Sequence, residues 1–384
     1  MMKTTLLLLI VSLQTMALSA APLKAFRPGE VWPDNHGVHI NAHAGGILVH
    51  QGTYYWFGQH MIEGEAGAYA MVGVHVYSSK NLYDWNDEGI ALRVSDDPRS
   101  DITKGCILER PKVLYNAKTD KFVMWFHLER KGKGYTSARC GVAVADRPTG
   151  PFRFLDSFRP DAGAWPINVP AELKKPLSAE EAARLGKFKL RGGLVANLPL
   201  NLIFRRDFKG GQMARDMTLF LDDDGRAYHV CASEDNSTLH ISQLTDDYLR
   251  SSGKYVRVFP GGFNEAPALF KHRGNYYLIT SGCTSWAPNM ARLAVADSIW
   301  GPYRALGNPC VGNDATLTFH GQSTYVLPVP GKSGAFIFMA DRWQPQNAID
   351  SRYLWLPIQF QQGRPLIPWT DQWDLSVFDR TASR

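Results

Sequence analysis

The amino-acid sequence predicts an all-β protein, because short apolar strand signals are dense and helical periodicity is nearly absent. Aromatic-rich runs recur five times, and most follow a turn signal such as His-Arg-Gly-Asn or Asp-Asp-Asp-Gly-Arg. A polar residue and a second short apolar strand stand ahead of each run. Each unit is therefore predicted to contain a leading strand, a hairpin turn and an aromatic strand. The aromatic runs lie at residues 54–58, 122–128, 227–233, 276–282 and 335–341.

The outer parts of these units repeat as well, since residues 141–152 closely match residues 292–303. Self-similarity at a period of about 50 to 65 residues, with four strands per unit, is typical of a β-propeller. One longer interval is explained by an insertion near residues 156–206. Within it, residues 177–185 predict a short helix that begins with a Ser-x-x-Glu capping box. The predicted fold is thus a five-bladed β-propeller with a surface insertion carrying a short helix.

The first 20 residues predict a cleavable secretory signal peptide. They carry Lys3, an apolar stretch too short and interrupted to span a membrane, and small residues at the end. No other stretch could cross a bilayer. We therefore expect a periplasmic or secreted protein, with one propeller domain over residues 21–384 and no membrane span.

Composition and charge narrow the classes of function. The sequence holds 11 Trp, 15 Tyr and 19 Phe, which suits a carbohydrate site, although most aromatic residues build β-sheet cores. The net charge of +6 is scattered, so no nucleic-acid partner is expected. The five cysteines are widely spaced with no Cys-x-x-Cys, which predicts buried free thiols rather than a metal site.

The starts of the five leading strands carry Asn41, Glu109, Asp216, Glu265 and Gln322. Innermost strands of a propeller lie close to the central axis, so these side chains are expected to converge on one pocket. Converging carboxylates suit acid and base chemistry on a sugar. The alternative for each carboxylate is a structural ion pair with a neighbouring Arg.

The apolar Ala-Pro-Ala that follows Glu265 favours its neutral form, as a general acid requires. Asp216 could orient this acid and raise its pKa through its negative charge. Glu109 and Arg110 together offer acceptors and forked donors for sugar hydroxyls.

Two segments at these positions carry a family resemblance. Residues 215–228 (R-D-M-T-L-F-L-D-D-D-G-R-A-Y) and 265–278 (E-A-P-A-L-F-K-H-R-G-N-Y-Y-L) resemble paired segments of the glycoside hydrolase family 43 five-bladed propellers. This resemblance implies a glycosidase in which Glu265 is the general acid and Asp216 tunes it.

Further segments are similar to the exo-β-1,3-galactanase branch of that family, namely residues 40–48, 55–60, 109–112, 281–286 and 322–326. The similarity implies exo-acting release of terminal galactose from β-1,3-galactan chains, as in arabinogalactan, with inversion at the anomeric carbon. Plant or microbial galactan and arabinogalactan oligosaccharides are the expected partners, and a monomer is expected.

Most family members have an Asp base near the first strand, whereas this chain has Asn41-Ala42-His43 there. In the galactanase branch a Gln at the fifth strand is proposed to position or activate water, and Gln322 matches it. Because a neutral amide is a very weak base, Glu109 is the alternative candidate for the catalytic base. Gln59 stands where Glu is expected, so sugar contacts there are expected to differ.

The predicted catalytic residues are Glu265, Asp216 and Gln322, and the predicted substrate-binding residues are Glu109, Arg110, Gln59, Tyr135, Thr284, Trp286, Asn41 and His43. No metal ligand is assigned and no cofactor is required, although a central calcium is possible. Two alternative functions stay open: an α-L-arabinofuranosidase or β-xylosidase of the same family, and a non-catalytic carbohydrate-binding propeller, which the missing Asp base favours.

Overall fold

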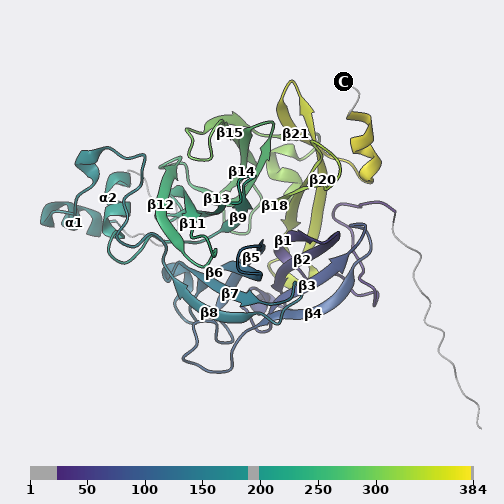
Figure 1. The fold of residues 1–384 in the computed structure, drawn as a ribbon, viewed down its shortest axis with the longest axis horizontal. Helices are drawn as coiled ribbons and strands as arrows, with labels where there is room; N and C mark the ends of the chain where they lie inside the picture. Colours follow the sequence, from purple (N-terminus) through teal and green to yellow (C-terminus); the bar gives the residue numbers. More distant parts are fainter. Residues whose placement is uncertain (1–23, 189–198, 382–384) are drawn as a thin grey trace, which may run out of the picture.

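Five antiparallel sheets surround a common centre in the computed structural model, which describes residues 24–188 and 199–381 (Figure 1). The inner strands of neighbouring sheets contact one another around this centre. The predicted five-bladed, all-β propeller is therefore confirmed. The predicted signal peptide lies outside the described residues.

Each blade is a four-stranded meander that begins with its inner strand. The inner strands are β1 (His43–His50), β5 (Ile107–Asn116), β9 (Met217–Leu221), β13 (Asn264–His272) and β18 (Gln322–Pro328). The aromatic strands are β2 (Thr53–His60), β6 (Lys121–Glu129), β10 (Ala227–Ser233), β14 (Asn275–Gly282) and β19 (Phe336–Arg342). The third strands are β3 (Gly73–Ser79), β7 (Arg139–Ala145), β11 (Thr238–Leu244), β15 (Arg292–Ala296) and β20 (Arg352–Gln361). The outer strands are β4 (Asn86–Arg93), β8 (Arg153–Phe158), β12 (Ser251–Val258), β16 (Arg304–Gly307) and β21 (Arg364–Pro368), and β17 (Cys310–Val311) pairs parallel with β21.

The aromatic runs build the core between the blades. Five apolar clusters each join side chains of two neighbouring blades. Between the first and last blades, for example, the rings of Trp56 and Trp355 lie 4.7 Å apart, and both are almost fully buried. The two ends of the described chain meet beside these blades, where Phe26 N donates to Trp373 O at 2.7 Å. Most of the aromatic residues therefore stabilise the fold rather than offer surface to a sugar.

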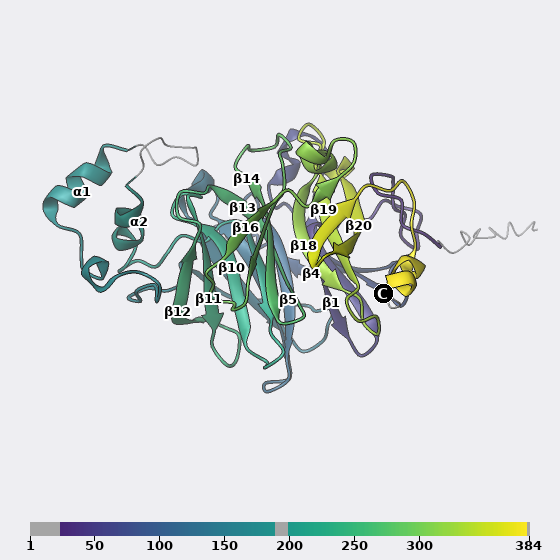
Figure 2. The ribbon, with the colours of Figure 1, turned by 90° about the horizontal axis from the view of Figure 1, so that it is seen from above.

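The insertion between β8 and β9 extends outward beside β12 (Figure 2). It contains α1 (Ala179–Gly186), where Ser178 and Glu181 form the predicted capping box. A second helix that the sequence did not predict, α2 (Leu200–Arg206), packs against α1. Within residues 24–188 and 199–381, no helix is long and apolar enough to cross a membrane.

Six short 3-10 segments complete the described structure. They are η1 (Glu65–Ala68), η2 (Gly134–Thr136), η3 (Ala171–Leu173), η4 (Ala315–His320), η5 (Ala348–Asp350) and η6 (Leu375–Thr381). Of these, η2 and η4 lie in loops that lead to the pocket described below.

Candidate active site

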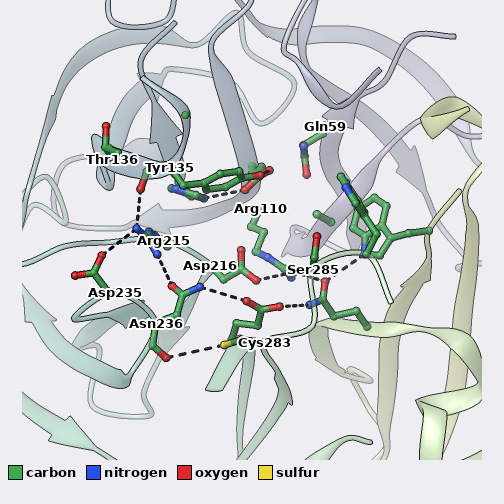
Figure 3. A pocket seen from close by; sticks show the side chains of 18 of the residues that line it. Gln59, Arg110, Tyr135, Thr136, Arg215, Asp216, Asp235, Asn236, Cys283 and Ser285 are labelled. Carbon is green, nitrogen blue, oxygen red and sulfur yellow. Dashed lines mark hydrogen bonds and ion pairs between the residues drawn. The ribbon is translucent and has the colours of Figure 1, made fainter. Parts of the chain in front are cut away.

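A pocket of about 650 Å³ lies over the starts of the inner strands (Figure 3). Its walls come from two regions of each blade: the residues at or close to the start of the inner strand, and the end of the aromatic strand with the loop that follows it. The lining residues are Ala44, Gln59, Met61, Glu109, Arg110, His127, Lys133, Gly134, Tyr135, Thr136, Arg215, Asp216, Asp235, Asn236, Glu265, Cys283, Ser285, Trp286, Gln322 and Trp343. Such a volume is typical of small-ligand sites.

Bulges in the inner strands direct these side chains. The pairing register of β1, β5 and β13 shifts near the start of each strand. In each shift one residue other than Gly adopts a left-handed backbone, with φ of 50° at Ala44, 54° at Arg110 and 53° at Ala266. Such bulges re-aim side chains next to functional sites. Glu109 and Glu265 each stand directly before one of these left-handed residues.

Glu265 lies at the base of the pocket beside Asp216. The backbone N–H of Ala266 donates to Asp216 Oδ2 at 3.1 Å, which fixes the second carboxylate next to the first. Burial, and then the negative charge of Asp216, raise the pKa of Glu265 to about 8. Glu265 is therefore mostly protonated at neutral pH, which is the state of a general acid.

Arg110 lies on the floor of the pocket and is only 4% exposed. Its Nη2 donates to Asp216 Oδ2 at 2.9 Å and to Gln322 Oε1 at 2.7 Å, while Nη1 donates to Ser323 O at 3.0 Å. These protein partners accept hydrogen bonds from the guanidinium donors that were predicted to bind sugar hydroxyls. Arg110 therefore supports Asp216 and Gln322, and its contact with a sugar stays a prediction.

The amide of Gln322 is surrounded by partners on both sides. Its Nε2 donates to Glu265 Oε1 and to Ser281 Oγ, both at 3.1 Å. Its Oε1 accepts from Arg110 Nη2 and, at 3.2 Å, from Trp343 Nε1. With donors around the oxygen and acceptors around the nitrogen, the partners fix the orientation of the amide.

A strained turn leads into Gln322. Thr318, Phe319 and His320 are three consecutive left-handed residues, with φ of 52°, 56° and 65°. Each such residue costs about 1–2 kcal/mol, so the turn depends on its surroundings. Phe319 is buried, and its carbonyl accepts from Arg342 Nη2 at 2.8 Å. The position of Gln322 is therefore built into the fold.

Glu109 faces the pocket from the opposite wall. Its Oε1 accepts from the Tyr135 hydroxyl at 2.7 Å, and its Oε2 lies 2.9 Å from His127 Nδ1. The other ring nitrogen of His127 lies 3.0 Å from Glu129 Oε1. Burial alone would lower the pKa of His127, but these two carboxylates raise it to about 9. His127 is therefore protonated at neutral pH and donates from both ring nitrogens.

Of the remaining predicted contacts, the structure brings Gln59, Tyr135 and Trp286 to the pocket wall. Gln59 lies at the end of β2 and is 5% exposed. Trp286 is 40% exposed at the rim, where its ring packs edge-on at 5.5 Å against Trp343.

Three predicted contacts do not line the pocket. The amide of Asn41 bonds to both backbone groups of Met61, and the fully buried His43 stacks on the Tyr353 ring at 5.1 Å. The Thr284 hydroxyl donates to Ala287 O at 2.6 Å and so closes a surface turn. In the structure these side chains are used in packing and turn formation, so their role as sugar ligands stays a prediction.

Asn236, Cys283 and Trp343 also line the pocket, although the sequence pattern did not predict them. Each lies in a loop that follows an aromatic strand, as does Tyr135, whereas Gln59 is near the end of its aromatic strand. In an antiparallel blade the end of the second strand lies beside the start of the first, so this position was a usable signal. Cys283 is also the half-buried exception among the five free thiols, the other four being buried as predicted.

Three side chains at the centre are close enough together to be considered as ligands of a cation. Glu109, His127 and Asp216 bring ligand-type atoms within 4.8 Å of one another. However, both ring nitrogens of His127 face carboxylates, one of them Glu129, and Asp216 is paired with Arg110. A ligating imidazole must be unprotonated. This donor set therefore does not fit a cation.

Beneath the pocket, the side chain of Lys112 crosses from β5 to β1. Its Nζ donates to Ala44 O at 2.9 Å and to Arg110 O at 3.4 Å. A Cβ at Gly46 would lie 2.5 Å from Lys112 Cδ, so only Gly leaves room for it. The neighbouring Ala44 N–H donates to buried Asp341. A protein amino group thus fills part of the interior where a central ion was considered.

Comparisons with known proteins agree with this architecture. The family model described as glycosyl hydrolases family 43 matches residues 190–346. A solved family 43 β-1,3-galactosidase with galactodeoxynojirimycin is 54% identical to this chain, with a TM-score of 0.84. The alignment covers 91% of this chain and 100% of that one. The chain belongs to glycoside hydrolase family 43.

For more distant relatives, the match covers a smaller share of the relative's own length. An exo-β-1,3-galactanase from Phanerochaete chrysosporium, solved with β-1,3-galactotriose, is 30% identical over 92% of this chain and 68% of that one, with a TM-score of 0.72. A β-D-galactofuranosidase from Aspergillus niger is 30% identical over 121 residues, and the match spans only 35% of that relative.

Proposed function

We propose that this family 43 protein releases terminal galactose from β-1,3-galactan chains of the arabinogalactan type, with inversion at the anomeric carbon. The observation that carries the proposal is Glu265, a buried and largely protonated carboxyl at the base of a sugar-sized pocket. The similar β-1,3-galactosidase and exo-β-1,3-galactanase structures support the choice of sugar and linkage. Arg110 and Gln322 close the floor of the pocket, which favours a chain end as substrate.

In this proposal Glu265 gives its proton to the glycosidic oxygen as the bond from that oxygen to the anomeric carbon breaks. Asp216 keeps Glu265 protonated before reaction through its charge, and Arg110 holds Asp216 in place. Glu109, Tyr135 and Gln59 offer acceptors and donors to the hydroxyls of the bound sugar.

Gln322 would place the water that attacks the opposite face of the sugar. Its Nε2 lies 3.1 Å from Glu265 Oε1, whereas inverting enzymes keep acid and base roughly 6.5–9.5 Å apart. A sugar bound between the two groups must therefore displace the Gln322 side chain from Glu265 and break the contacts that hold its amide. Glu109 is the alternative acceptor for the proton of the water.

Product analysis tests the function. β-1,3-galactobiose and β-1,3-galactan should yield galactose, whereas nitrophenyl α-L-arabinofuranoside and β-xyloside should be cleaved far more slowly. Release of arabinose or xylose without galactose would contradict the proposed sugar. Binding of galactan without turnover would instead support the non-catalytic propeller.

The protonation of Glu265 predicts how activity declines on the alkaline side, or alkaline limb, of the pH profile. Because the reacting form is protonated, kcat/KM is expected to fall as pH rises through about 8. Asp216→Asn removes a charge that raises the pKa of Glu265, so the limb should move to lower pH. A limb that stays in place in this variant would show that Asp216 does not tune the acid.

We also propose that activity requires no metal ion, because Lys112 and the protonated His127 occupy the polar interior below the sugar. Dialysis against EDTA is expected to leave kcat and the melting temperature unchanged. A loss of activity or of thermal stability that is reversed by adding calcium would contradict this.

Export through the N-terminal signal is a further proposal, which N-terminal sequencing of the mature protein would test.

A further inference from the structure

The turn between β10 and β11 has an unusual backbone. Glu234, Asp235 and Asn236 are three consecutive left-handed residues, with φ of 50°, 56° and 65°. None is Gly, so the conformation persists only where the surroundings over-determine it. Two of the three, Asp235 and Asn236, line the pocket. What holds this turn therefore also shapes the wall of the pocket.

The first residue of the turn is tied to helix α2 through Arg257. Glu234 is fully buried and accepts from Arg257 Nε at 2.6 Å and Nη2 at 2.8 Å, with His240 Nε2 at 2.8 Å as a third partner. Arg257 Nη2 also donates to Leu200 O, the first residue of α2, at 3.0 Å. Its guanidinium lies 4.4 Å from the Phe204 ring of the same helix. The insertion thus helps to position the arginine that binds Glu234.

The second residue of the turn is bound by α2 directly. Arg206, the last residue of α2, donates from Nη1 to Asp235 Oδ2 at 3.1 Å. The other oxygen of Asp235 accepts from Arg215 Nη2 at 3.4 Å. Arg206 is itself held by a two-point pair with Asp207, at 2.7 and 2.6 Å. Asp235 is only 4% exposed, so these charges are paired within the protein.

The third residue of the turn reaches the acid (Figure 3). Asn236 Oδ1 accepts from Arg215 Nη1 at 3.3 Å, and Asn236 Nδ2 lies 3.4 Å from Glu265 Oε2. Arg215 also donates to Tyr135 O at 2.6 Å, which ties the neighbouring loop to the same network. A continuous series of polar contacts therefore runs from the insertion to the carboxyl of Glu265.

We infer that α2 of the insertion is a positioning element of the active site: Arg206 holds the left-handed turn Glu234–Asn236 so that the Asn236 amide faces Glu265. Helix α2 is then a support of the active site, whereas α1 of the insertion makes none of these contacts. Arg206 touches no substrate and acts through Asp235 and Asn236. The inference rests on the proposed function in one respect, namely that Glu265 is the acid.

A defect in positioning the acid has a signature that a general loss of stability lacks. Proton donation matters most for a poor leaving group and least for an activated one. Arg206→Gln is therefore expected to lower kcat on β-1,3-galactobiose by about tenfold. On a dinitrophenyl β-galactoside the loss should be less than about twofold. Asn236→Ala should show the same split, and the double variant should lose less than the product of the two effects.

Three matched variants complete the experiment. Arg184→Gln changes an exposed arginine on α1 and should leave both rates unchanged, while Arg206→Lys should restore part of the loss. If Arg206→Gln folds poorly, Asp235→Asn removes the same ion pair without a change in size. Equal losses on both substrates, additive effects, or wild-type rates in Arg206→Gln would overturn the inference. Glu265→Gln is measured in parallel to distinguish two failures. If the proposed function is wrong, Glu265→Gln stays active on galactobiose. If only the role of α2 is wrong, Glu265→Gln is still inactive on it.

Discussion

Replacing Glu265 with Gln is expected to lower kcat on β-1,3-galactobiose by about a thousandfold. Gln is nearly isosteric with Glu, but it cannot give a proton to the leaving oxygen. Steady-state rates on the disaccharide and on a dinitrophenyl β-galactoside measure the effect. The activated substrate should retain much more of its rate, because its leaving group needs little protonation.

The control for this variant is Glu180→Gln on the exposed face of α1, which should behave as the wild type. Melting temperatures of both variants show whether the fold is intact. A Glu265→Gln protein that keeps more than about a tenth of the disaccharide rate would remove the general acid from the proposed mechanism.

Replacing Gln322 with Ala is expected to lower kcat by about a hundredfold on both substrates. The side chain links Glu265, Arg110 and Trp343, and in the proposal it places the attacking water. Attack by water is needed whatever the leaving group, so an activated substrate should not rescue this variant. This pattern distinguishes it from Glu265→Gln.

Glu109→Gln is the comparison for that variant, since Glu109 is the alternative proton acceptor. If Gln322 places the water, external azide should restore turnover of Gln322→Ala on the activated substrate and should not do so for Glu109→Gln. Azide rescue of Glu109→Gln alone would transfer the role to Glu109.

The starts of the inner strands could be predicted because their signals are local. Turn residues and a short apolar alternation mark each one, so Glu109, Asp216 and Glu265 were found together. The role of a residue was harder to predict where a bulge sets the direction of its side chain. Arg110 follows Glu109 in sequence, but its left-handed backbone turns the guanidinium onto the pocket floor, where it pairs with Asp216 and Gln322.

Residues brought in by loops could not be found from strand periodicity. Asn236 and Trp343 reach the site only because a left-handed turn and the end of β19 place them there. Helix α2 escaped prediction because it is short and has no capping side chain. Its role at the turn depends on ion pairs between residues distant in sequence, such as Arg257 with Glu234.

The most direct test of the mechanism is the anomeric form of the first product. Galactose released from β-1,3-galacto-oligosaccharides should appear as the α-anomer in NMR spectra recorded before mutarotation, because water attacks the face opposite the leaving group. First appearance of the β-anomer would contradict inversion and, with it, the assignment of Gln322 as the residue that places the water.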